Sequence, residues 1–194
     1  GPEISAIEDR LAKAAGARHC ISCSSGTDAL ILALLAKGLK PGEGVIVPSF
    51  TFAASAEVMP VLGAIPVFAE VDAKTFNLDP AGLPAALSAG RASDVRIVGI
   101  IGVGLFGQPA DYDAINAFAA AEGLWVIDDA AQSFGATWNG TGVGTLASMT
   151  CTSFFPAKPL GCYGDGGAVF TDDDDEAAVC LLYTSDAADA VRGV

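Results

Sequence analysis

The sequence predicts an α/β domain in which a mostly parallel sheet is covered by helices on both faces. The chain has 194 residues, which is enough for one substantial domain with its own core. Apolar residues make up 52% of it and charged residues only 17%, which favours a buried sheet. Short apolar strands alternate with helical segments along the chain, and that alternation is typical of parallel sheets.

The first half of the chain is expected to contain four helices and three strands. Residues 3–15 place Ile4, Ile7 and Leu11 at spacings of three and four, which indicates an amphipathic helix that ends at Gly16. A nearly all-apolar helix is expected to end before Gly38, and Asp79 begins another. The nearly all-apolar helix covers residues 28–37, and the helix that Asp79 begins covers residues 79–88. A further helix is expected between them, over residues 53–62. The strands are expected at residues 18–23, 45–47 and 65–71.

The second half continues the alternation and adds one hairpin. Asp111 is expected to cap a helix over residues 111–122, and the strand at 124–127 ends on Asp128 and Asp129. Asn139-Gly140 is a strong turn signal, which predicts a hairpin over residues 136–143. The remaining strands are expected at 95–103, 149–155 and 167–171, and a last helix begins over residues 172–179.

The charge of the chain excludes some partners. The formal net charge is −13, and the ten Lys and Arg residues form no cluster. Nucleic acids and anionic membranes both need a basic patch, so we expect neither as a partner. No apolar run is long enough to span a bilayer, and the first residues lack the pattern of a signal peptide. A cytoplasmic protein is the expected default.

The cysteines predict neither disulfides nor a metal site. Five cysteines, an odd number, do not form a disulfide framework in a chain of this length. Cys20 and Cys23 form a CxxC pattern, but their spacing within a strand sends the two side chains to opposite faces of the sheet. No second CxxC is present, and His19 is the only histidine. We therefore expect no metal site.

The segment around Lys158 is the first candidate for chemistry. Lys158 follows an apolar strand and lies between Pro156 and Pro159, in a segment that continues with several glycines. A lysine fixed at the edge of a sheet can be desolvated and act as a nucleophile. The alternative is an ordinary loop lysine between two strands. These residues alone leave both interpretations open.

One interpretation of the site is a dinucleotide fold. Gly102, Gly104 and Gly107 form a literal GxGxxG pattern after an apolar strand. Asp128 follows near the position where a ribose-binding acid belongs. This alternative is an NAD-binding, Rossmann-type oxidoreductase. Gln108 and the following proline separate the third glycine from the next helix, however, and Lys158 has no role in such a site.

The other interpretation is a pyridoxal phosphate site. That cofactor needs a lysine amine, a carboxylate at its pyridinium nitrogen, an anion cradle and a cover for the ring. Lys158 can supply the amine, and Asp129 ends a buried strand. Ser25, Gly26 and Thr27 lie at a helix N-terminus, where exposed backbone N–H groups favour phosphate. Because ligands of such sheets bind at the carboxyl ends of strands, these residues can converge, with Phe52 stacked on the ring.

Five motifs extend this interpretation to a known family. SSGTDAL, PSFTF, FGQPAD, VIDDAAQSFGA and SFFPAKPLGCYGDGGA resemble sugar aminotransferases of the DegT/DnrJ/EryC1/StrS type. The resemblance implies fold type I, the three-layer α/β/α large domain of the PLP-dependent, aspartate aminotransferase-like fold. By that resemblance Lys158 forms the Schiff base and shuttles the proton, and Asp129 pairs with the pyridine nitrogen. Gln132 then lies at the phenolic oxygen of the ring, Phe52 stacks on it, and the phosphate is held by Gly26, Thr27 and Ser153.

The resemblance also implies a substrate class and an assembly. Transamination of a nucleotide-linked keto sugar is expected, because the dehydratases of the family replace the lysine with histidine. FFPAKPLGCYGDGG is similar to the branch that aminates the 3-keto group of a UDP-linked, N-acetylated sugar uronate with glutamate as donor. Family members are homodimers in which the partner completes each site. Two positions depart from the family pattern, because many members carry His at Gly104 and Asn at Ser24.

The resemblance finally predicts how the chain divides. Residues 1–179 match the large domain, incomplete at both ends, and the small C-terminal domain of the family is absent. Residues 180–194 begin with a decapeptide similar to a translated transposase adapter used in DNA sequencing, so we expect a non-native tail there. An ordinary, divergent helix is the alternative. We expect such a fragment to be inactive and poorly soluble alone, because apolar faces would be left uncovered.

Overall fold

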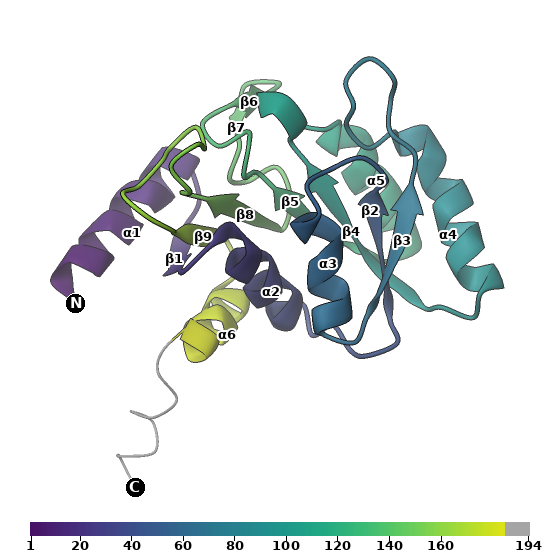
Figure 1. Cartoon of the computed structure of the whole chain (residues 1–194), viewed down its shortest axis with the longest axis horizontal. Coiled ribbons are helices and arrows are strands. Elements are labelled where there is room, and N and C mark those ends of the chain that lie inside the picture. Colours follow the sequence, from purple (N-terminus) through teal and green to yellow (C-terminus); the bar gives the residue numbers. More distant parts are fainter. Residues whose placement is uncertain (185–194) are drawn as a thin grey trace, which may run out of the picture.

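The computed structural model describes residues 1–184 and contains a seven-stranded mixed sheet (Figure 1). The strand order is β1-β9-β8-β5-β4-β2-β3, and β9 is antiparallel to both of its neighbours, while every other pair is parallel. The strands are β1 (His19–Cys23), β2 (Gly44–Pro48), β3 (Ile65–Ala69), β4 (Ile97–Val103), β5 (Trp125–Asp129), β8 (Met149–Ser153) and β9 (Gly167–Thr171). The predicted mostly parallel, mixed sheet is confirmed.

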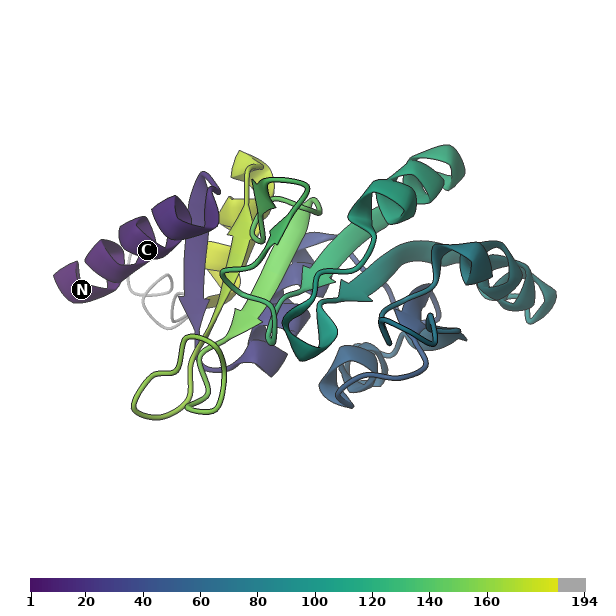
Figure 2. The same cartoon turned by 90° about the horizontal axis from the view of Figure 1, so that it is seen from above.

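Helices cover both faces of the sheet, which gives the expected three layers. The helices are α1 (Pro2–Ala15), α2 (Gly26–Ala36), α3 (Ala54–Val61), α4 (Leu83–Ala92), α5 (Tyr112–Glu122) and α6 (Asp174–Thr184), with short 3-10 turns at η1 (Pro80–Gly82) and η2 (Leu105–Gly107). Side chains of α2, α3 and α6 share one core cluster, whereas α1, α4 and α5 pack on the other face. Figure 2 shows the sheet between these layers from above.

The local signals explain most of the element boundaries. Gly16 ends α1 with a φ of 78°, and the side chain of Asp111 caps α5 by accepting a hydrogen bond from the backbone of Ala114. The hairpin joins β6 (Thr137–Trp138) to β7 (Thr141–Gly142) through Asn139 and Gly140, both with positive φ. Two helices run further than predicted, because α4 continues to residue 92 and α6 to residue 184.

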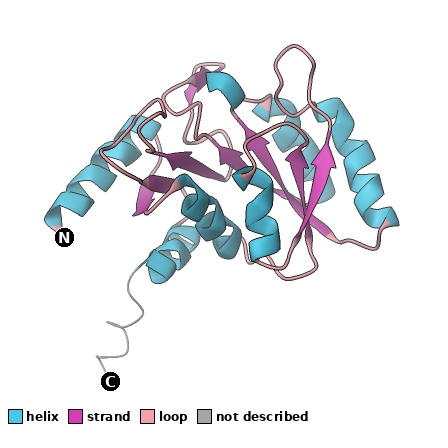
Figure 3. Cartoon of the chain, in the orientation of Figure 1, coloured by secondary structure: helices cyan, strands magenta, loops and turns pink. Residues whose placement is uncertain are grey.

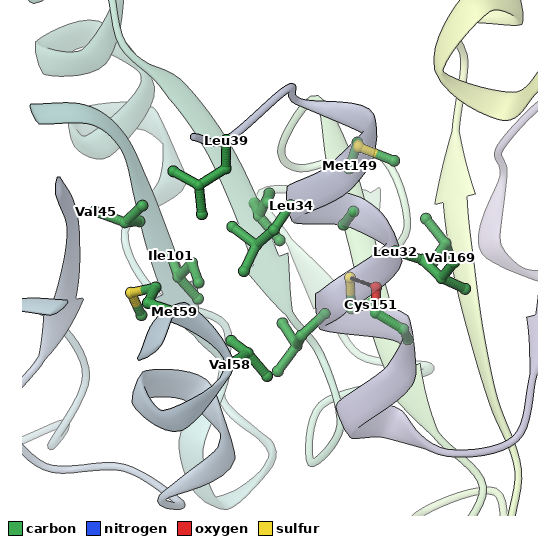
Figure 4. Packing of buried hydrophobic residues seen from close by; sticks show 14 of the residues in the cluster. Leu32, Leu34, Leu39, Val45, Val58, Met59, Ile101, Met149, Cys151 and Val169 are labelled. Carbon is green, nitrogen blue, oxygen red and sulfur yellow. Dashed lines mark hydrogen bonds between the residues drawn. The ribbon is translucent and has the colours of Figure 1, made fainter. Parts of the chain in front are cut away.

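The largest part of the core lies between the sheet and the α2–α3 layer (Figure 4). Leu34 of α2, Met59 of α3 and Ile101 of β4 are each 0% exposed. The short central strands are apolar on both faces because helices cover them on both sides. This packing fixes how the strands are placed along their length relative to α2 and α3. It therefore also fixes the positions of the strand ends.

The carboxyl ends of the parallel strands meet at one edge of the sheet, where longer loops gather (Figure 3). The loop between β8 and β9 carries Lys158 and returns to the same edge, because Gly167 at the start of β9 lies opposite Ser153 at the end of β8. None of the helices within residues 1–184 combines the length and apolar character of a membrane span.

The expected tail at residues 180–194 is only partly described. Residues 180–184 continue α6, and Cys180 is buried in the core cluster that also contains α2. Residues 185–194, the rest of the expected tail, lie outside the described part of the chain. The division at residue 179 and the non-native origin of the tail stay predictions.

Close packing of Trp125 on Gly99 provides a test of how tightly β4 and β5 are matched. A Cβ atom at Gly99 would lie 2.1 Å from Cε3 of the Trp125 ring in the neighbouring strand. We expect Gly99→Ala to lower the free energy of unfolding by about 1–3 kcal/mol, because the bulky ring must shift in a dense core. Chemical denaturation measures the change.

Gly142→Ala is the matched control for this substitution. A Cβ atom there would meet only the backbone oxygen of Ala15, at an ordinary 3.6 Å. Its effect on the free energy of unfolding should stay below about 0.5 kcal/mol. Equal losses in the two variants would contradict the tight match between β4 and β5.

Candidate functional site

A cavity of about 510 Å³ opens at the carboxyl ends of the strands. It contains seven of the eight residues predicted for the site. The lining consists of Ser25, Gly26, Thr27, Leu30, Phe52, Ala54, Asp129, Ala131, Ser153, Phe155, Ala157, Lys158 and Asp165. The eighth predicted residue, Gln132, lines an adjoining hollow that shares Lys158 with the cavity. Segments far apart in the sequence therefore converge as the sheet topology predicts.

Lys158 reaches the cavity from a tight turn after β8. Its backbone N–H donates to the carbonyl of Phe155 at 2.8 Å. Its Nζ atom lies 5.6 Å from the centroid of the Phe52 ring, which is a cation–π distance. Phe52 itself is 65% exposed and lies at the mouth of the cavity. The amine and an exposed aromatic face thus lie together at one entrance.

Asp129 enters the cavity from the end of β5 and is buried. Its Oδ2 accepts a hydrogen bond from the hydroxyl of Ser55 at 2.7 Å, and its Oδ1 accepts one from the backbone of Ala131 at 3.2 Å. Burial raises the pKa of the Asp129 carboxyl, while these two hydrogen bonds and the charge of Lys158 act in the opposite direction. A carboxylate held in this way is suited to pairing with a cation.

Ser55 is a site residue that the sequence did not indicate. It lies in α3, is 0% exposed, and also shares a hydrogen bond of 3.1 Å with the hydroxyl of Thr51. The two hydroxyls therefore form a short chain that ends on Asp129. A serine four positions after a threonine near the start of a helix is a common pattern. It does not identify a site residue unless the position of the neighbouring strand end is known.

The N-terminus of α2 forms one wall of the cavity beside the end of β8. The Ser25 hydroxyl caps the helix by accepting from the backbone of Asp28 at 3.1 Å, and it donates to the carboxylate of the same residue. Gly26 touches Ser153 so closely that a Cβ atom would lie 2.6 Å from the Ser153 Cβ. The exposed N–H groups at this helix end and the nearby hydroxyls can cradle an anion such as phosphate.

Gln132 is held from the opposite side of the site. Its side-chain oxygen accepts a hydrogen bond from the backbone of Phe106 at 2.9 Å. Phe106 has a left-handed backbone with a φ of 57°, which turns its N–H toward Gln132. Because the side-chain oxygen of Gln132 is held by this hydrogen bond, its amide NH2 is oriented as a donor. It can donate to an oxygen near Lys158.

The position at which many family members carry histidine is filled in a different way here. A Cβ atom at Gly104 would lie 2.1 Å from Oγ of Ser133, which is buried. Ser133 therefore takes the space that a side chain at residue 104 would need. A histidine could not be placed at Gly104 in this structure without moving Ser133.

The structure does not support the dinucleotide alternative. Asp128 is 0% exposed and points away from the cavity, where one of its oxygens accepts from the Tyr112 hydroxyl. Gly107 is followed by an extended Gln108 and not by a helix, because α5 begins only at Tyr112. A ribose could not reach the carboxylate, and Gly107, the third glycine of the pattern, does not open a helix toward a pyrophosphate.

Cys20, Cys151 and Cys180 are buried core residues, Cys23 is partly buried, and Cys162 is exposed. Cys20 and Cys23 belong to clusters on opposite faces of the sheet, and burial raises the pKa of both thiols to about 12. At neutral pH neither is a thiolate, so neither is a reactive nucleophile. Within residues 1–184 no group of three or more His, Cys, Asp and Glu side chains is placed to bind a metal ion.

Comparison with known proteins connects this geometry to one family. Residues 1–192 match the family model described as "DegT/DnrJ/EryC1/StrS aminotransferase family". A UDP-2-acetamido-2-deoxy-3-oxo-D-glucuronate aminotransferase from Pseudomonas aeruginosa is 54% identical over 91% of this chain and 48% of its own length. A UDP-N-acetyl-3-dehydro-alpha-D-glucosamine 3-aminotransferase from Acidithiobacillus ferrooxidans is 47% identical over 89% of this chain and 45% of its own length.

Solved structures give the same result. A DegT/DnrJ/EryC1/StrS aminotransferase from Brucella abortus superimposes with a TM-score of 0.91 at 46% identity, covering 94% of this chain and 49% of that one. NtdA from Bacillus subtilis, solved with bound cofactor PMP, has a TM-score of 0.86 at 33% identity over 94% of this chain and 40% of its own. The chain thus spans about half the length of the curated relatives it matches. It belongs to the DegT/DnrJ/EryC1/StrS aminotransferase family.

Proposed function

We propose that the protein containing this chain is a pyridoxal phosphate-dependent aminotransferase that acts on a nucleotide-linked keto sugar. The observation that carries this proposal is the common cavity of Lys158 and Asp129, an amine and a buried carboxylate at the ends of neighbouring strands. A dehydratase of this family would lack the lysine. An NAD-binding site would need Asp128 to reach the ribose, whereas Asp128 is buried and bonded to Tyr112. Family membership supports the same reaction class.

The residues of the cavity fit the proposed cofactor at each of its functional groups. The N-terminus of α2, with Gly26 and Thr27, and the hydroxyl of Ser153 would hold the phosphate. Phe52 would cover the ring, and Asp129 would pair with its protonated nitrogen. The close contact of Gly26 with Ser153 leaves a backbone cradle that a larger residue would fill. When bound, pyridoxal phosphate supplies an electron sink for the carbon atom next to the transferred nitrogen.

Lys158 has two tasks in this proposal. Its Nζ atom would hold the cofactor, and the same amine would move a proton as a general base and acid. Asp129 would pair with the ring nitrogen in its ionised form, which Ser55 favours by donating a hydrogen bond to the carboxylate. The amide of Gln132 would donate to the phenolic oxygen of the ring. The roles of the residues that would touch the cofactor rest on their positions in the cavity and the adjoining hollow.

The finer substrate assignment follows the relatives. We propose a UDP-linked, N-acetylated 3-keto sugar uronate as amino acceptor and glutamate as donor, in the synthesis of cell-surface polysaccharide or related sugars. The relative from Pseudomonas aeruginosa is named for a 3-oxo-D-glucuronate, and the one from Acidithiobacillus ferrooxidans for a 3-dehydro sugar. Both names place the amine on the same carbon, which supports a 3-keto over a 4-keto substrate.

We also propose that the protein acts as a homodimer in the cytoplasm, with no nucleic-acid or membrane partner. Phe50, Phe52 and Phe106 expose half or more of their side chains around the site, and a second copy would cover such a surface. All five cysteines are free thiols, as is typical of cytoplasmic proteins. The charge of −13 is unfavourable for nucleic acid.

The covalent role of Lys158 predicts where borohydride fixes the cofactor. Protein loaded with pyridoxal phosphate should be yellow, and reduction should attach the cofactor to the peptide that contains Lys158. We expect Lys158→Arg to abolish this label and to lower transamination by about a hundredfold or more, because guanidinium cannot act as the base. Mass spectrometry of the digested protein and an amino-transfer assay measure the two effects.

Lys74→Arg is the matched control, since Lys74 is an exposed lysine outside the cavity. Its label and activity should equal those of the unchanged protein. A borohydride label on a different lysine would contradict the role assigned to Lys158.

The hydrogen bond from Ser55 predicts a pH-dependent loss of cofactor affinity in Ser55→Ala. Without this donor the pKa of Asp129 rises further, so the carboxyl becomes protonated at a higher pH. Its attraction for a pyridinium cation is present above the pKa and is lost as the pH falls. We expect about tenfold weaker binding of pyridoxamine phosphate, a typical effect of one hydrogen bond to a charged group, and a profile displaced to higher pH.

Ser88→Ala is the control for Ser55→Ala, because the Ser88 hydroxyl donates only to the exposed Pro84 carbonyl in α4. Calorimetric titration across a pH series measures both variants. If Ser55→Ala bound the cofactor with an unchanged affinity and pH profile, Ser55 would have no role toward Asp129.

The substrate assignment predicts a preference between two sugars. Protein supplied with glutamate should aminate the UDP-linked 3-keto uronate and leave the 4-keto isomer largely unreacted. Chromatography of the amino sugar and of the 2-oxo acid product measures each reaction. Amination of 4-keto sugars with refusal of 3-keto sugars would reject the 3-keto assignment and leave the reaction class in place.

A further inference from the structure

A second buried carboxylate lies directly behind Asp129. Because side chains alternate along a strand, Asp129 faces the cavity while Asp128 points to the α5 side of the sheet. In the sheet, Asp128 lies between Gly102 of β4 and Thr150 of β8. Both Asp128 and Thr150 are 0% exposed. None of the proposed catalytic roles uses this carboxylate.

Tyr112 of α5 is the hydrogen-bond partner of Asp128. The Tyr112 hydroxyl donates to Oδ1 of Asp128 at 2.5 Å, and Tyr112 is 1% exposed. The hydroxyl lies over Gly102, where a Cβ atom would approach it to 2.8 Å. Gly102 therefore belongs to this contact and not to a dinucleotide site. The first residue of α5 is bonded to the end of β5 on the face opposite the cavity.

The carboxylate is costly for the protein to keep. Among residues 1–184, Oδ2 of Asp128 and Oγ1 of Thr150 are buried without a hydrogen-bond partner. A buried carboxyl with one unmatched oxygen destabilises a fold that an asparagine or an apolar side chain would serve at lower cost. The other titratable groups that interact with it are the Tyr112 phenol from α5, Asp129 on the opposite face of the same strand, and Cys151 on β8. None of these provides a positive charge.

We propose that Asp128 is a positioning residue that acts through Asp129. Its hydrogen bond to Tyr112 fixes the carboxyl end of β5 from the far face of the sheet. Its buried carboxylate adds to the negative potential with which Asp129 holds a pyridinium cation. This inference rests on the proposed function, because it needs a cationic ring at Asp129.

The two carboxyl groups interact through the strand, and this interaction predicts a pH dependence. Burial raises the pKa of Asp128 to about 7; the Tyr112 hydrogen bond lowers it, and the neighbouring Asp129 raises it. A cation bound at Asp129 favours the ionised form of Asp128, so binding releases a proton. Affinity for the cation should therefore rise with pH through this range and be lost as the pH falls.

Pyridoxamine phosphate is the probe that tests this inference, because it needs no covalent bond to Lys158. Calorimetric titrations of the protein containing this chain compare it with Asp128→Asn, which keeps an acceptor for Tyr112 but carries no charge. We expect affinities within about twofold of each other near pH ~6 and about tenfold weaker binding by Asp128→Asn near pH ~8, which corresponds to one pKa unit of coupling. The titrations of the probe itself are common to both proteins and cancel in the ratio.

Two further variants separate this effect from general destabilisation. In Tyr112→Phe the pKa of Asp128 should rise, so the increase in affinity moves to higher pH while the carboxylate remains. Ile115→Val shortens a fully buried side chain of the same helix. It should lower the melting temperature and leave the affinity ratio at one. Tyr112→Phe also tests the inference if Asp128→Asn fails to fold.

Each outcome bears on a defined claim. An affinity ratio between Asp128→Asn and the unchanged protein that stays constant across the pH series would overturn the inference, even if the melting temperature fell. An unmoved profile in Tyr112→Phe would overturn it as well. If the unchanged protein bound no pyridoxamine phosphate at any pH, the proposed function would fail and the inference with it. A ratio that grows with pH supports both.

Discussion

The end of β5 is the constraint on which the rest of the site depends. Two carboxylates follow each other at the last positions of a central, buried strand, and the alternation of a strand sends them to opposite faces. Each needs a donor from the layer that covers its face, and Ser55 of α3 and Tyr112 of α5 supply these donors. The three layers are therefore fixed to one another at the point where Asp129 enters the cavity.

The reversed strand β9 brings the anion cradle to the same point. Gly167 at the start of β9 lies opposite both Cys23 at the end of β1 and Ser153 at the end of β8. The helix that follows β1 therefore begins beside Ser153. A Cβ atom at Gly167 would lie 2.3 Å from the Ser25 carbonyl, so this close approach requires glycine. The lysine loop, which joins β8 to β9, begins and ends at the cavity for the same topological reason.

The candidate site residues at strand ends could be predicted from the sequence. The residues that contact one another across layers could not. Asp129 ends an apolar strand and Lys158 follows another, so the rule that ligands bind at carboxyl ends predicts that they converge, and both line the same cavity. Ser55 and Tyr112 lie inside or at the start of helices, where their partners depend on strand register and helix packing. Asp128 fitted a ribose-binding pattern by spacing; the residues after Gly107 already argued against that pattern, and the burial of Asp128 on the far face excludes it. The direction of β9 was also not assigned, because the segment between β8 and β9 is just long enough for a parallel crossover and therefore left both directions open.

The charges of the cavity explain how an acidic protein can bind a phosphate-bearing cofactor. Among the residues that line the cavity, Lys158 is the single cation, and Asp129 and Asp165 are acids. In the proposed reaction Lys158 cannot serve as a permanent phosphate ligand, because its amine would act as a nucleophile and base. The anion must then be held by neutral donors, and the N-terminus of α2 with the hydroxyl of Ser153 offers them without adding a charge. A cradle of this kind adds no positive charge that would compete with a protonated ring nitrogen for Asp129.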